Sequence, residues 1–440
     1  STVLSSLLLS SALAQDAATE QCEQLCLEEN RMCVVADDGG FECGECLEGF
    51  VEFGKLVGNP TCVEVDTLKW EQFLEEYQPV YKTELSPEER LEILIGIARF
   101  ISEHNANQTA SFTLGLTPYS VDSDLEYVQR SGYFNAEDAS AEVEMYDAPT
   151  IAAADLQGRV DWVELGGVTS VKDQGRCGSC WAVSMCGAIE GAAFANNGYY
   201  QSLSFQQFVS CNERNLGCDG GNVAIAALYA SFENGISRLN EYEYTDYFGT
   251  TTQECYLSPS ATPKAVEVTK PQIVAGMSTS LTYEERSEIF KQVLDQQPIA
   301  MVIKSACRTL SNYRSGVITD DGDCACSRPD CLDHAVLMVG YDDTAEIPYF
   351  KIKNSWGTGW GEDGYVRIAQ ASKGTYGLFG ILAEGTIVQA QNVTAQVVDK
   401  EQDTPFPIWA IVLIVALPLC LCLCLCTWFK KRGAKEAAGE

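Results

Sequence analysis

The sequence Gln174-Gly-Arg-Cys-Gly-Ser-Cys-Trp-Ala182 places two cysteines three residues apart, with a tryptophan directly after the second. From position 181 to position 192, apolar residues recur every three or four positions without a proline, as in a buried helix. We therefore expect Cys180 in the first turn of a helix, where free backbone N–H groups and the helix dipole favour an anion. A thiol there loses its proton more easily, and the thiolate is the nucleophile. The stretch predicts a catalytic cysteine.

A catalytic cysteine needs a base, and the chain contains only two histidines. His104 lies in a charged, helical segment well before the cysteine. His334 lies in an apolar, strand-like run that ends at a glycine turn, residues 331–340. By elimination, His334 is the predicted base for Cys180. Asn354 follows it in a motif rich in glycine and tryptophan.

Together these residues resemble the active-site signature of papain-like cysteine proteases, over residues 158–388. The resemblance implies an α+β, papain-like two-lobed fold, with Cys180 on a helical left lobe and His334 on a β-barrel right lobe. It implies that Cys180 attacks the scissile carbonyl as a thiolate paired with the His334 imidazolium. Asn354 then orients the imidazole ring, and Gln174 with the Cys180 backbone N–H forms the oxyanion hole.

The resemblance also assigns a substrate-binding surface. Its members are Gly220, Gly221, Asn222, Val223, Val302, Leu332, Asp333, Ala335, Trp356 and Glu384. Most of the pocket for the side chain two positions before the cut is apolar, and Glu384 adds a carboxylate at its far end, so we expect Phe and Arg to be accepted. Trp356 would also screen the contact between histidine and asparagine from water. No paired histidines are present to hold a substrate carboxy-terminus, which favours endopeptidase action, and the chemistry requires no cofactor or metal.

The cysteines of the peptidase segment fall into three groups. By resemblance, Cys177 pairs with Cys218 and Cys211 pairs with Cys255, and both bridges lie in the helical lobe. Cys186 is predicted to be a buried free thiol on the same helix as the nucleophile. A local cluster has three alternative pairings among Cys307, Cys324, Cys326 and Cys331.

The peptidase domain, residues 155–388, follows a charged, helical prosegment at residues 66–135. Residues 88–105 resemble the inhibitory helix of the papain-family propeptide, and residues 112–119 resemble the chain that leaves this helix and runs through the cleft. We expect this prosegment to inhibit the enzyme, and a plain solvated helix is the alternative. Residues 136–154 are rich in Ala, Asp and Glu and predict an exposed activation linker, cleaved near its end.

Residues 15–65 form a cysteine-rich module with little else to build a core, so disulfides must stabilise it. The module resembles an EGF-like domain, which implies the pairs Cys22–Cys33, Cys26–Cys43 and Cys46–Cys62. Six cysteines allow fifteen pairings, so the residues alone leave the connectivity open. A structural spacer and a partner-binding module are equally favoured roles, and the partner is unknown. A zinc site is less favoured because no histidine lies nearby.

Both ends of the chain carry targeting signals. Residues 1–14 combine an apolar run with a small-residue cleavage site, as in a signal peptide. Residues 408–429 form an uncharged run long enough to cross a bilayer, and the tail at residues 430–440 begins with three basic residues. Residues 389–407 form a polar stalk. These features predict a type I membrane protein of the secretory pathway, in a lysosome or vacuole or at the cell surface, with a lumenal or extracellular catalytic domain.

The composition limits the remaining alternatives. A net charge of −33 argues against nucleic acid as a partner, and 20 cysteines indicate an oxidising compartment. Two sequons predict glycosylation at Asn107 and Asn392. One rival function is a thiol–disulfide oxidoreductase that uses Cys177 and Cys180, although it leaves His334 unexplained. Another is an inactive, membrane-held adhesion protein. We expect peptide or protein substrates and autoinhibition by the chain's own prosegment.

Overall fold

The computed structural model describes residues 26–27, 29–35, 41–54, 61–79, 81, 83–107, 109–134, 142–148, 156–249, 254–255, 264–277, 280–326 and 328–392. The chain divides into two compact units, residues 1–393 and 394–440, and all described residues belong to the first. The predicted signal peptide, membrane span and tail all lie outside the described residues. Within the described ranges, no helix is long and apolar enough to cross a bilayer.

The α-helices are α2 (Trp70–Tyr77), α3 (Pro87–Asn105), α4 (Asp124–Ser131), α6 (Cys180–Asn197), α7 (Phe205–Cys211), α8 (Val223–Phe232), α9 (Tyr283–Leu294) and α10 (Arg308–Ser311). The strands are β1 (Arg31–Val35), β2 (Phe41–Cys46), β3 (Phe50–Phe53), β4 (Thr61–Glu64), β5 (Phe112–Leu114), β6 (Glu144–Met145), β7 (Arg159–Asp161), β8 (Val266–Val274), β9 (Ile299–Ile303), β10 (Tyr313–Ile318), β11 (His334–Asp342), β12 (Tyr349–Lys353), β13 (Tyr365–Ala369) and β14 (Gly385–Asn392).

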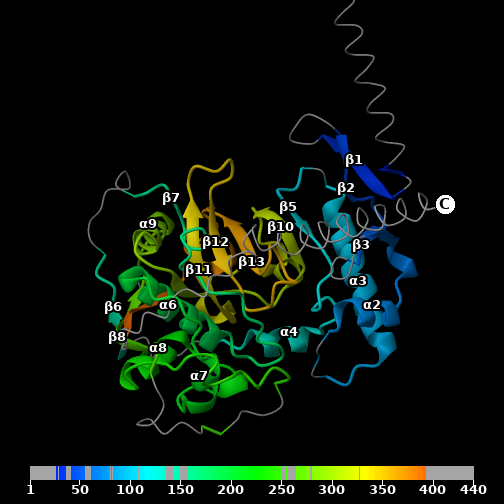
Figure 1. Ribbon diagram of the computed structural model, residues 1–440. Coiled ribbons are helices and arrows are strands. Elements are labelled where there is room, and N and C mark those ends of the chain that lie inside the picture. Colours follow the sequence, from blue (N-terminus) through cyan, green and yellow to red (C-terminus); the bar gives the residue numbers. More distant parts are fainter. Residues whose placement is uncertain are drawn as a thin grey trace, which may run out of the picture. The chain divides into compact units, whose positions relative to one another are not determined.

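The helix α6 crosses the peptidase domain and packs against β11 and β14 of the large sheet (Figure 1). All residues of its first four turns are buried, which explains why the sequence is apolar on every face. Two glycines allow the helix to approach the strands closely. A Cβ atom at Gly187 would lie 2.8 Å from Leu337, and one at Gly191 would lie 2.5 Å from Pro298. The helix ends at Gly198, which adopts a left-handed conformation with φ 72°.

The strand-rich half of the molecule is one mixed sheet of ten strands. Its order is β5-β10-β13-β12-β11-β9-β14-β8-β6, and β7 pairs with β11 beside this path. The sequence predicts a β-barrel here, and that detail is wrong: over the described strands the path has two ends and does not close. The two end strands, β5 and β6, come from the prosegment and the linker. Both margins of the peptidase sheet are therefore paired with segments that precede the peptidase domain.

The linker is only partly the exposed segment that its composition predicts. Its strand β6 pairs in parallel with β8, and the backbone N–H of Tyr146 donates to the oxygen of Ile273 at 2.8 Å. Val143 is 5% exposed and packs against Ala224 and Ile273. An edge strand offers unpaired backbone groups to any extended segment, and residues 142–148 occupy that position on β8. Local composition gave no signal for this pairing, because it depends on where the sheet ends.

The prosegment folds around the helix α3. A capping box between Ser86 and Glu89, with Pro87 in the first turn, starts the helix. Arg90 of this helix is completely buried. It forms an ion pair with Glu126 of α4 at 3.0 Å, and both side chains are 1% exposed. Arg90 also donates to the carbonyl oxygen of Val121 at 2.9 Å. The helix is therefore a packed element of the zymogen and not a plain solvated helix.

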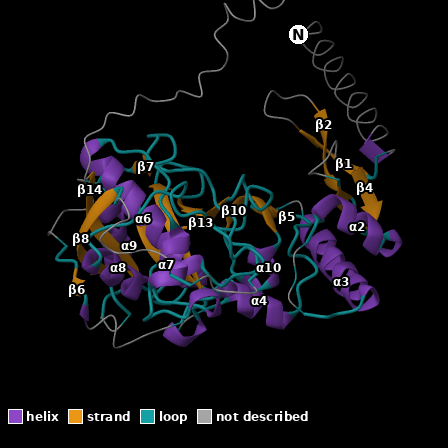
Figure 2. Cartoon of the chain, turned by 60° about the horizontal axis from the view of Figure 1, so that its bottom comes forward, coloured by secondary structure: helices purple, strands orange, loops and turns teal. Residues whose placement is uncertain are grey.

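The N-terminal module consists of two small antiparallel sheets, β1–β2 and β3–β4, and lies beside α2 and α3 (Figure 2). Disulfides join Cys26 to Cys43 and Cys46 to Cys62, the pairs that the resemblance implies. Cys33 is also disulfide-bonded. Its expected partner, Cys22, lies outside the described residues.

The pair between α3 and α4 makes prosegment stability depend on pH. Burial alone raises the pKa of Glu126, but hydrogen bonds, mainly from Arg90, hold that pKa at about 2, below the ordinary 4.5. Its stabilising contribution is therefore full above pH 4.5 and is lost as the pH falls from there towards about 2. We expect Glu126→Gln to destabilise the prosegment by about 3–5 kcal/mol and to flatten this pH dependence. Thermal unfolding of the zymogen between pH 5 and 2.5 checks this, with the exposed substitution Glu92→Gln on α3 as the control.

Candidate active site

Cys180 stands at the first position of α6, and the prosegment covers it. Its thiol donates to the carbonyl oxygen of Ser131 at 2.5 Å, and the backbone N–H of Ala335 donates to its sulfur at 3.4 Å. The side chain is completely buried. It is a free thiol, and the other free cysteine among the described residues is the equally buried Cys186. The structure thus places Cys180 in the first turn of a buried helix, where the sequence expects it.

His334 begins β11 and faces the same carbonyl oxygen. Its Nδ1 atom lies 3.3 Å from the oxygen of Ser131, and its Nε2 donates to Oδ1 of Asn354 at 2.8 Å. The indole of Trp356 packs on the imidazole with ring centroids 5.0 Å apart. Cys180 and His334 therefore converge on one oxygen atom, with the asparagine holding the far side of the ring.

Gln174 lies in the loop before α6 and is completely buried. Its Nε2 donates to the carbonyl oxygen of Arg130 at 2.9 Å and to that of Cys177 at 2.8 Å. The hydroxyl of Ser355 donates to its Oε1 at 2.6 Å, which fixes the orientation of the amide. One amide N–H therefore points towards the prosegment, at the position from which it would stabilise an oxyanion, and the other is bonded within the loop.

The predicted nucleophile and the predicted oxyanion donor contact two different peptide groups of the prosegment. The sulfur of Cys180 contacts the oxygen of Ser131, whereas the amide of Gln174 contacts the oxygen of Arg130. Attack requires the sulfur to reach a carbonyl carbon whose own oxygen points at the donors. No single peptide group meets both conditions here. The prosegment fills the site in a geometry that does not support its cleavage.

The prosegment uses backbone groups that the sequence assigns to substrate. The N–H of Gly221 donates to the oxygen of Gly132 at 2.8 Å, and the N–H of Phe134 donates to the oxygen of Gly221 at 3.3 Å. On the other wall, the N–H of Tyr133 donates to the oxygen of Asp333 at 2.9 Å. Tyr133 bridges Gly221 in the parallel sense. Gly220 leaves no space for a side chain, because a Cβ atom there would lie 2.7 Å from the oxygen of Gly132.

The side chain of Tyr133 reaches the predicted specificity pocket. Nδ2 of Asn222 donates to its hydroxyl at 3.4 Å. Burial, and then the charges of Glu384 and Cys180, raise the pKa of Tyr133, so its phenol is neutral and lies within the field of that glutamate. The other predicted lining residues are all buried, namely Val223, Val302, Leu332 and Ala335. A neutral aromatic side chain of the prosegment thus lies against Asn222 of the predicted pocket in the zymogen.

The buried catalytic pair is held in its neutral form. Burial raises the pKa of the Cys180 thiol to about 12, despite hydrogen bonds from nearby backbone N–H groups that lower it. Burial also lowers the pKa of His334, against the raising effect of its bond to Asn354. Both shifts follow from the loss of water under the prosegment. The thiolate–imidazolium pair expected from the sequence is therefore suppressed in this state.

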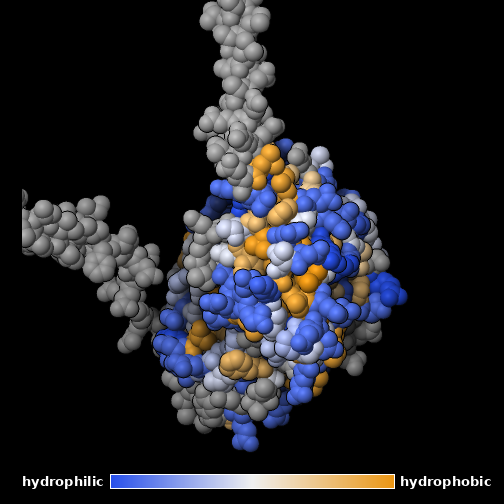
Figure 3. Space-filling model, turned by 90° about the vertical axis from the view of Figure 1, so that its right-hand side faces the viewer, coloured by the Kyte–Doolittle hydropathy of each residue, from blue (hydrophilic) through white to orange (hydrophobic). Residues whose placement is uncertain are grey.

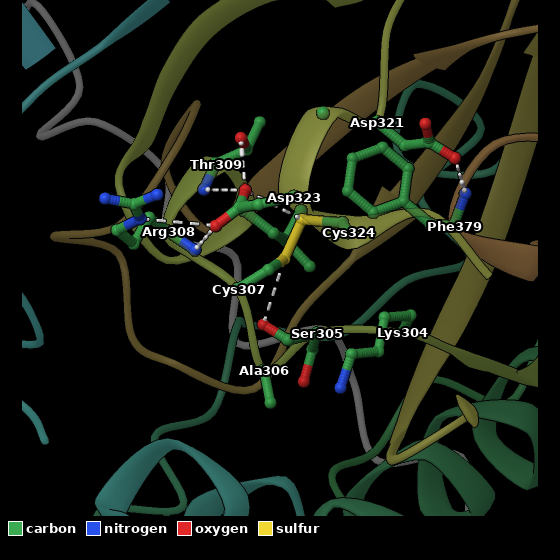
Figure 4. The surroundings of a disulfide bond; sticks show 12 residues. Lys304, Ser305, Ala306, Cys307, Arg308, Thr309, Asp321, Asp323, Cys324 and Phe379 are labelled. Atoms are coloured by element: carbon green, nitrogen blue, oxygen red, sulfur yellow. Dashed lines mark hydrogen bonds and ion pairs between the residues drawn. A yellow bond between two sulfur atoms is a disulfide. The ribbon is translucent and has the colours of Figure 1, made fainter. Parts of the chain in front are cut away.

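The disulfides leave the nucleophile free. Cys177 is bonded to Cys218 and Cys211 to Cys255, so Cys177 and Cys180 do not form a redox pair. The local cluster pairs as Cys307–Cys324 and Cys326–Cys331, in the segment that leads into His334. The carboxylate of Asp323 stabilises this segment. It accepts hydrogen bonds from the backbone N–H of Arg308 and from the hydroxyl of Thr309, both at 2.8 Å (Figure 4). Because Cys307 and Cys324 are joined, neither offers a thiolate to a metal beside Asp323.

One buried charged group beside the site is missing from the sequence prediction. Asp122 of the prosegment forms ion pairs with Arg130 and with Arg176, the latter at 2.7 Å, and all three side chains are at most 2% exposed. The guanidinium of Arg130 also lies over the ring of Trp356, 4.5 Å from its centroid. Arg176 belongs to the same buried loop as Gln174. Arg176 is a charged residue inside the active-site signature, and it was the one sequence signal that a buried acidic partner such as Asp122 exists.

Comparison with models of protein families matches residues 156–383 to the papain family cysteine proteases. The chain belongs to the papain family. A probable cysteine protease of Arabidopsis thaliana, RDL2, is 32% identical over 320 residues, which cover 71% of this chain and 83% of the relative. Fruit bromelain of Ananas comosus is 31% identical over 316 residues, covering 71% and 83%.

Solved structures of papain-family precursors show the same architecture. Digestive procathepsin L 3 of Tenebrio molitor is 26% identical with a TM-score of 0.60, and the match covers 72% of this chain and 97% of that one. The proform of the ragweed pollen allergen Amb a 11 is 27% identical with a TM-score of 0.59, covering 72% and 91%. The chain is therefore a papain-family cysteine protease with a proregion. The comparisons add no support for the EGF-like resemblance of the N-terminal module.

The contact between prosegment and thiol predicts that displacing the prosegment will increase thiol reactivity. Gly132 has φ 67°, and a Cβ atom there would lie 2.3 Å from the oxygen of Gly178. Gly132→Ala should therefore push the chain away from Cys180 and accelerate its alkylation by iodoacetamide at pH 6–8 by at least about tenfold. Gly96→Ala is the matched control, because a Cβ atom at Gly96 meets nothing within 4 Å. Equal labelling rates for the two variants would contradict this account.

Proposed function

We propose that this papain-family protease is an endopeptidase, made as an autoinhibited and membrane-anchored zymogen in the secretory pathway. The observation that carries the endopeptidase chemistry is the convergence of Cys180 and His334 on the oxygen of Ser131, with Asn354 2.8 Å from the far nitrogen of the imidazole. A substrate carbonyl carbon brought to the sulfur of Cys180, with its oxygen turned to where the oxygen of Arg130 lies, would face both the nucleophile and the amide of Gln174.

In the active enzyme, removal of the prosegment readmits water and restores the thiolate–imidazolium pair. The sulfur of Cys180 attacks the carbonyl carbon, and a C–S bond forms while the oxyanion accepts hydrogen bonds from Gln174 and the Cys180 N–H. The C–N bond then breaks as His334 gives its proton to the leaving amine. Next, His334 takes a proton from water, which attacks the thioester and releases the acid. Loss of the Gln174 donor would reduce the rate roughly 10²- to 10³-fold.

The preference of the pocket between apolar and cationic side chains depends on which cation lies near the carboxylate of Glu384. Arg286 is completely buried and donates to the carbonyl oxygens of Leu382 and Ala383, next to Glu384 in the sequence, at 3.2 and 2.9 Å. Burial lowers the pKa of Arg286, whereas Tyr376 and Glu384 raise it, so the two opposite charges act on one another. A substrate arginine would compete with Arg286 for this carboxylate. We infer that the pocket prefers large apolar or aromatic side chains and accepts arginine more slowly.

Membrane attachment and location rest on the sequence. The signal-like residues 1–14 and the apolar run at 408–429 support entry into the secretory pathway and a type I anchor. The disulfides of the described residues support an oxidising compartment. We propose a lumenal or extracellular catalytic domain, in a lysosome or vacuole or at the cell surface. Asn107 is exposed and available for glycosylation, and Asn392 lies in β14.

The proposed chemistry is tested by labelling the acid-activated protein with an epoxide-bearing peptide that reacts with catalytic thiols. The expected product is a single adduct on Cys180, located by peptide mapping. His334→Ala should abolish labelling, because the imidazolium that stabilises the thiolate is gone. Cys186→Ser should label normally. An adduct on Cys186 instead, or undiminished labelling of His334→Ala, would contradict the assigned roles.

The specificity proposal predicts how two substrates differ. Peptides with Phe two positions before the cut should be cleaved several-fold faster than matched peptides with Arg there. Glu384→Ala should reduce kcat/KM for the Arg peptide by about tenfold or more, while the Phe peptide changes little, because only the cation needs the carboxylate. If Arg peptides are cut by this variant as fast as before, Glu384 does not bind the substrate side chain.

A further inference from the structure

The N-terminal module packs against the prosegment through an apolar contact. Val51 of β3 is 2% exposed, and the ring of Phe53 meets that of Tyr77 on α2 edge-on, with centroids 5.7 Å apart. The backbone N–H of Gly49 donates to the hydroxyl of Ser102 on α3 at 2.8 Å. The strand β3 is therefore the surface of the module that contacts the prosegment in the zymogen.

One residue of the same strand extends beyond the prosegment to the peptidase domain. Glu52 forms an ion pair with Arg31 of β1 at 3.0 Å and a second ion pair with Arg314 of β10. The three side chains are only 12, 10 and 19% exposed for Arg31, Glu52 and Arg314. Figure 3 shows the outer face of this end of the molecule, where hydrophilic residues surround an apolar patch, whereas this ionic contact is mostly hidden from solvent.

Arg314 reaches the module past the prosegment strand that fills the sheet margin. Its neighbours Tyr313 and Ser315 pair with β5. A Cβ atom at Gly115 would lie 3.0 Å from Cδ of Arg314, so the glycine leaves space for the arginine stem. Burial lowers the pKa of Arg314 and the charge of Glu45 in β2 raises it, so a second acidic residue of the module acts on the same guanidinium.

A third contact joins the module to the place where α3 ends and β5 begins. Nδ2 of Asn105 donates to Glu45 at 3.4 Å and to the oxygen of Leu114 at 2.8 Å. The backbone N–H of Leu114 donates back to Oδ1 of Asn105 at 2.9 Å. Release of β5 from β10 would therefore break contacts of the module as well as the strand pairing.

We propose that the N-terminal module acts together with the prosegment to inhibit the enzyme. The ion pair between Glu52 and Arg314 joins the module directly to the peptidase domain. The pair holds β5 on β10 and thereby slows departure of the prosegment from the cleft. The module thus has a partner within its own chain, which favours a regulatory role over that of a spacer. Loss of either charge removes this direct ionic link and weakens the attachment, although Glu52 keeps its pair with Arg31 and Arg314 keeps the charge of Glu45 nearby.

The test measures how fast Cys180 becomes available in the full-length zymogen. Glu52→Gln and Arg314→Gln should each accelerate its alkylation by about three- to tenfold at constant pH, and the double variant should be no faster than the faster single one. Asp66→Asn is the matched control. It breaks the exposed pair between Asp66 and Arg99, which does not reach the peptidase domain.

Two further measurements separate this role from a general loss of structure. Hydrogen exchange should speed up at the amides of β5 in Glu52→Gln, while the amides of α6 stay protected. After complete activation, Arg314→Gln should cleave peptides with the wild-type kcat/KM, because Arg314 lies outside the catalytic site. Alkylation at the wild-type rate in both variants, additive effects in the double variant, or equal acceleration by Asp66→Asn would overturn the proposal.

Discussion

The zymogen depends on one contact, in which a single carbonyl oxygen of the prosegment lies against both members of the catalytic pair. The oxygen of Ser131 is 2.5 Å from the sulfur of Cys180 and 3.3 Å from the imidazole of His334. Its presence excludes water, and without water the charged forms of both groups become unfavourable. Inhibition is therefore both steric and electrostatic. The cleft is filled, and the nucleophile beneath it is kept as a thiol.

The rest of the chain before the peptidase domain keeps that carbonyl in place. The strand β5 pairs with one margin of the sheet, β6 pairs with the other, and the helix α3 joins the first of these to the N-terminal module. The buried ion pair between Asp122 and Arg176 joins the prosegment to the loop that carries Gln174. These attachments are far apart in the sequence and involve different chemistry.

The positions of Cys180, His334 and Asn354 could be predicted from sequence because each belongs to a local pattern. Cys180 begins an apolar helix, and His334 was the only suitable imidazole. Their chemistry alone therefore predicted that the two side chains lie close together. Contacts that arise only in the folded chain had no such signal. Arg286 and Glu384 are 98 positions apart, and Glu52 and Arg314 are 262 positions apart. The barrel was predicted from the family resemblance and failed for the same reason, since sheet closure depends on non-local pairing.

The strand pairing at both sheet margins has a consequence for the enzyme after activation. Once the prosegment and linker leave, backbone groups of residues 313–317 in β10 and of Gln272 and Ile273 in β8 lose partners, and open strand edges promote association between molecules. The chain already carries residues that oppose such self-association. Arg314 lies within one strand, and Lys270 with Pro271 lies within the other, where a charge and a missing N–H discourage a second chain from adding. The segments that inhibit the precursor thus also cover two strand edges that would otherwise be open to another chain.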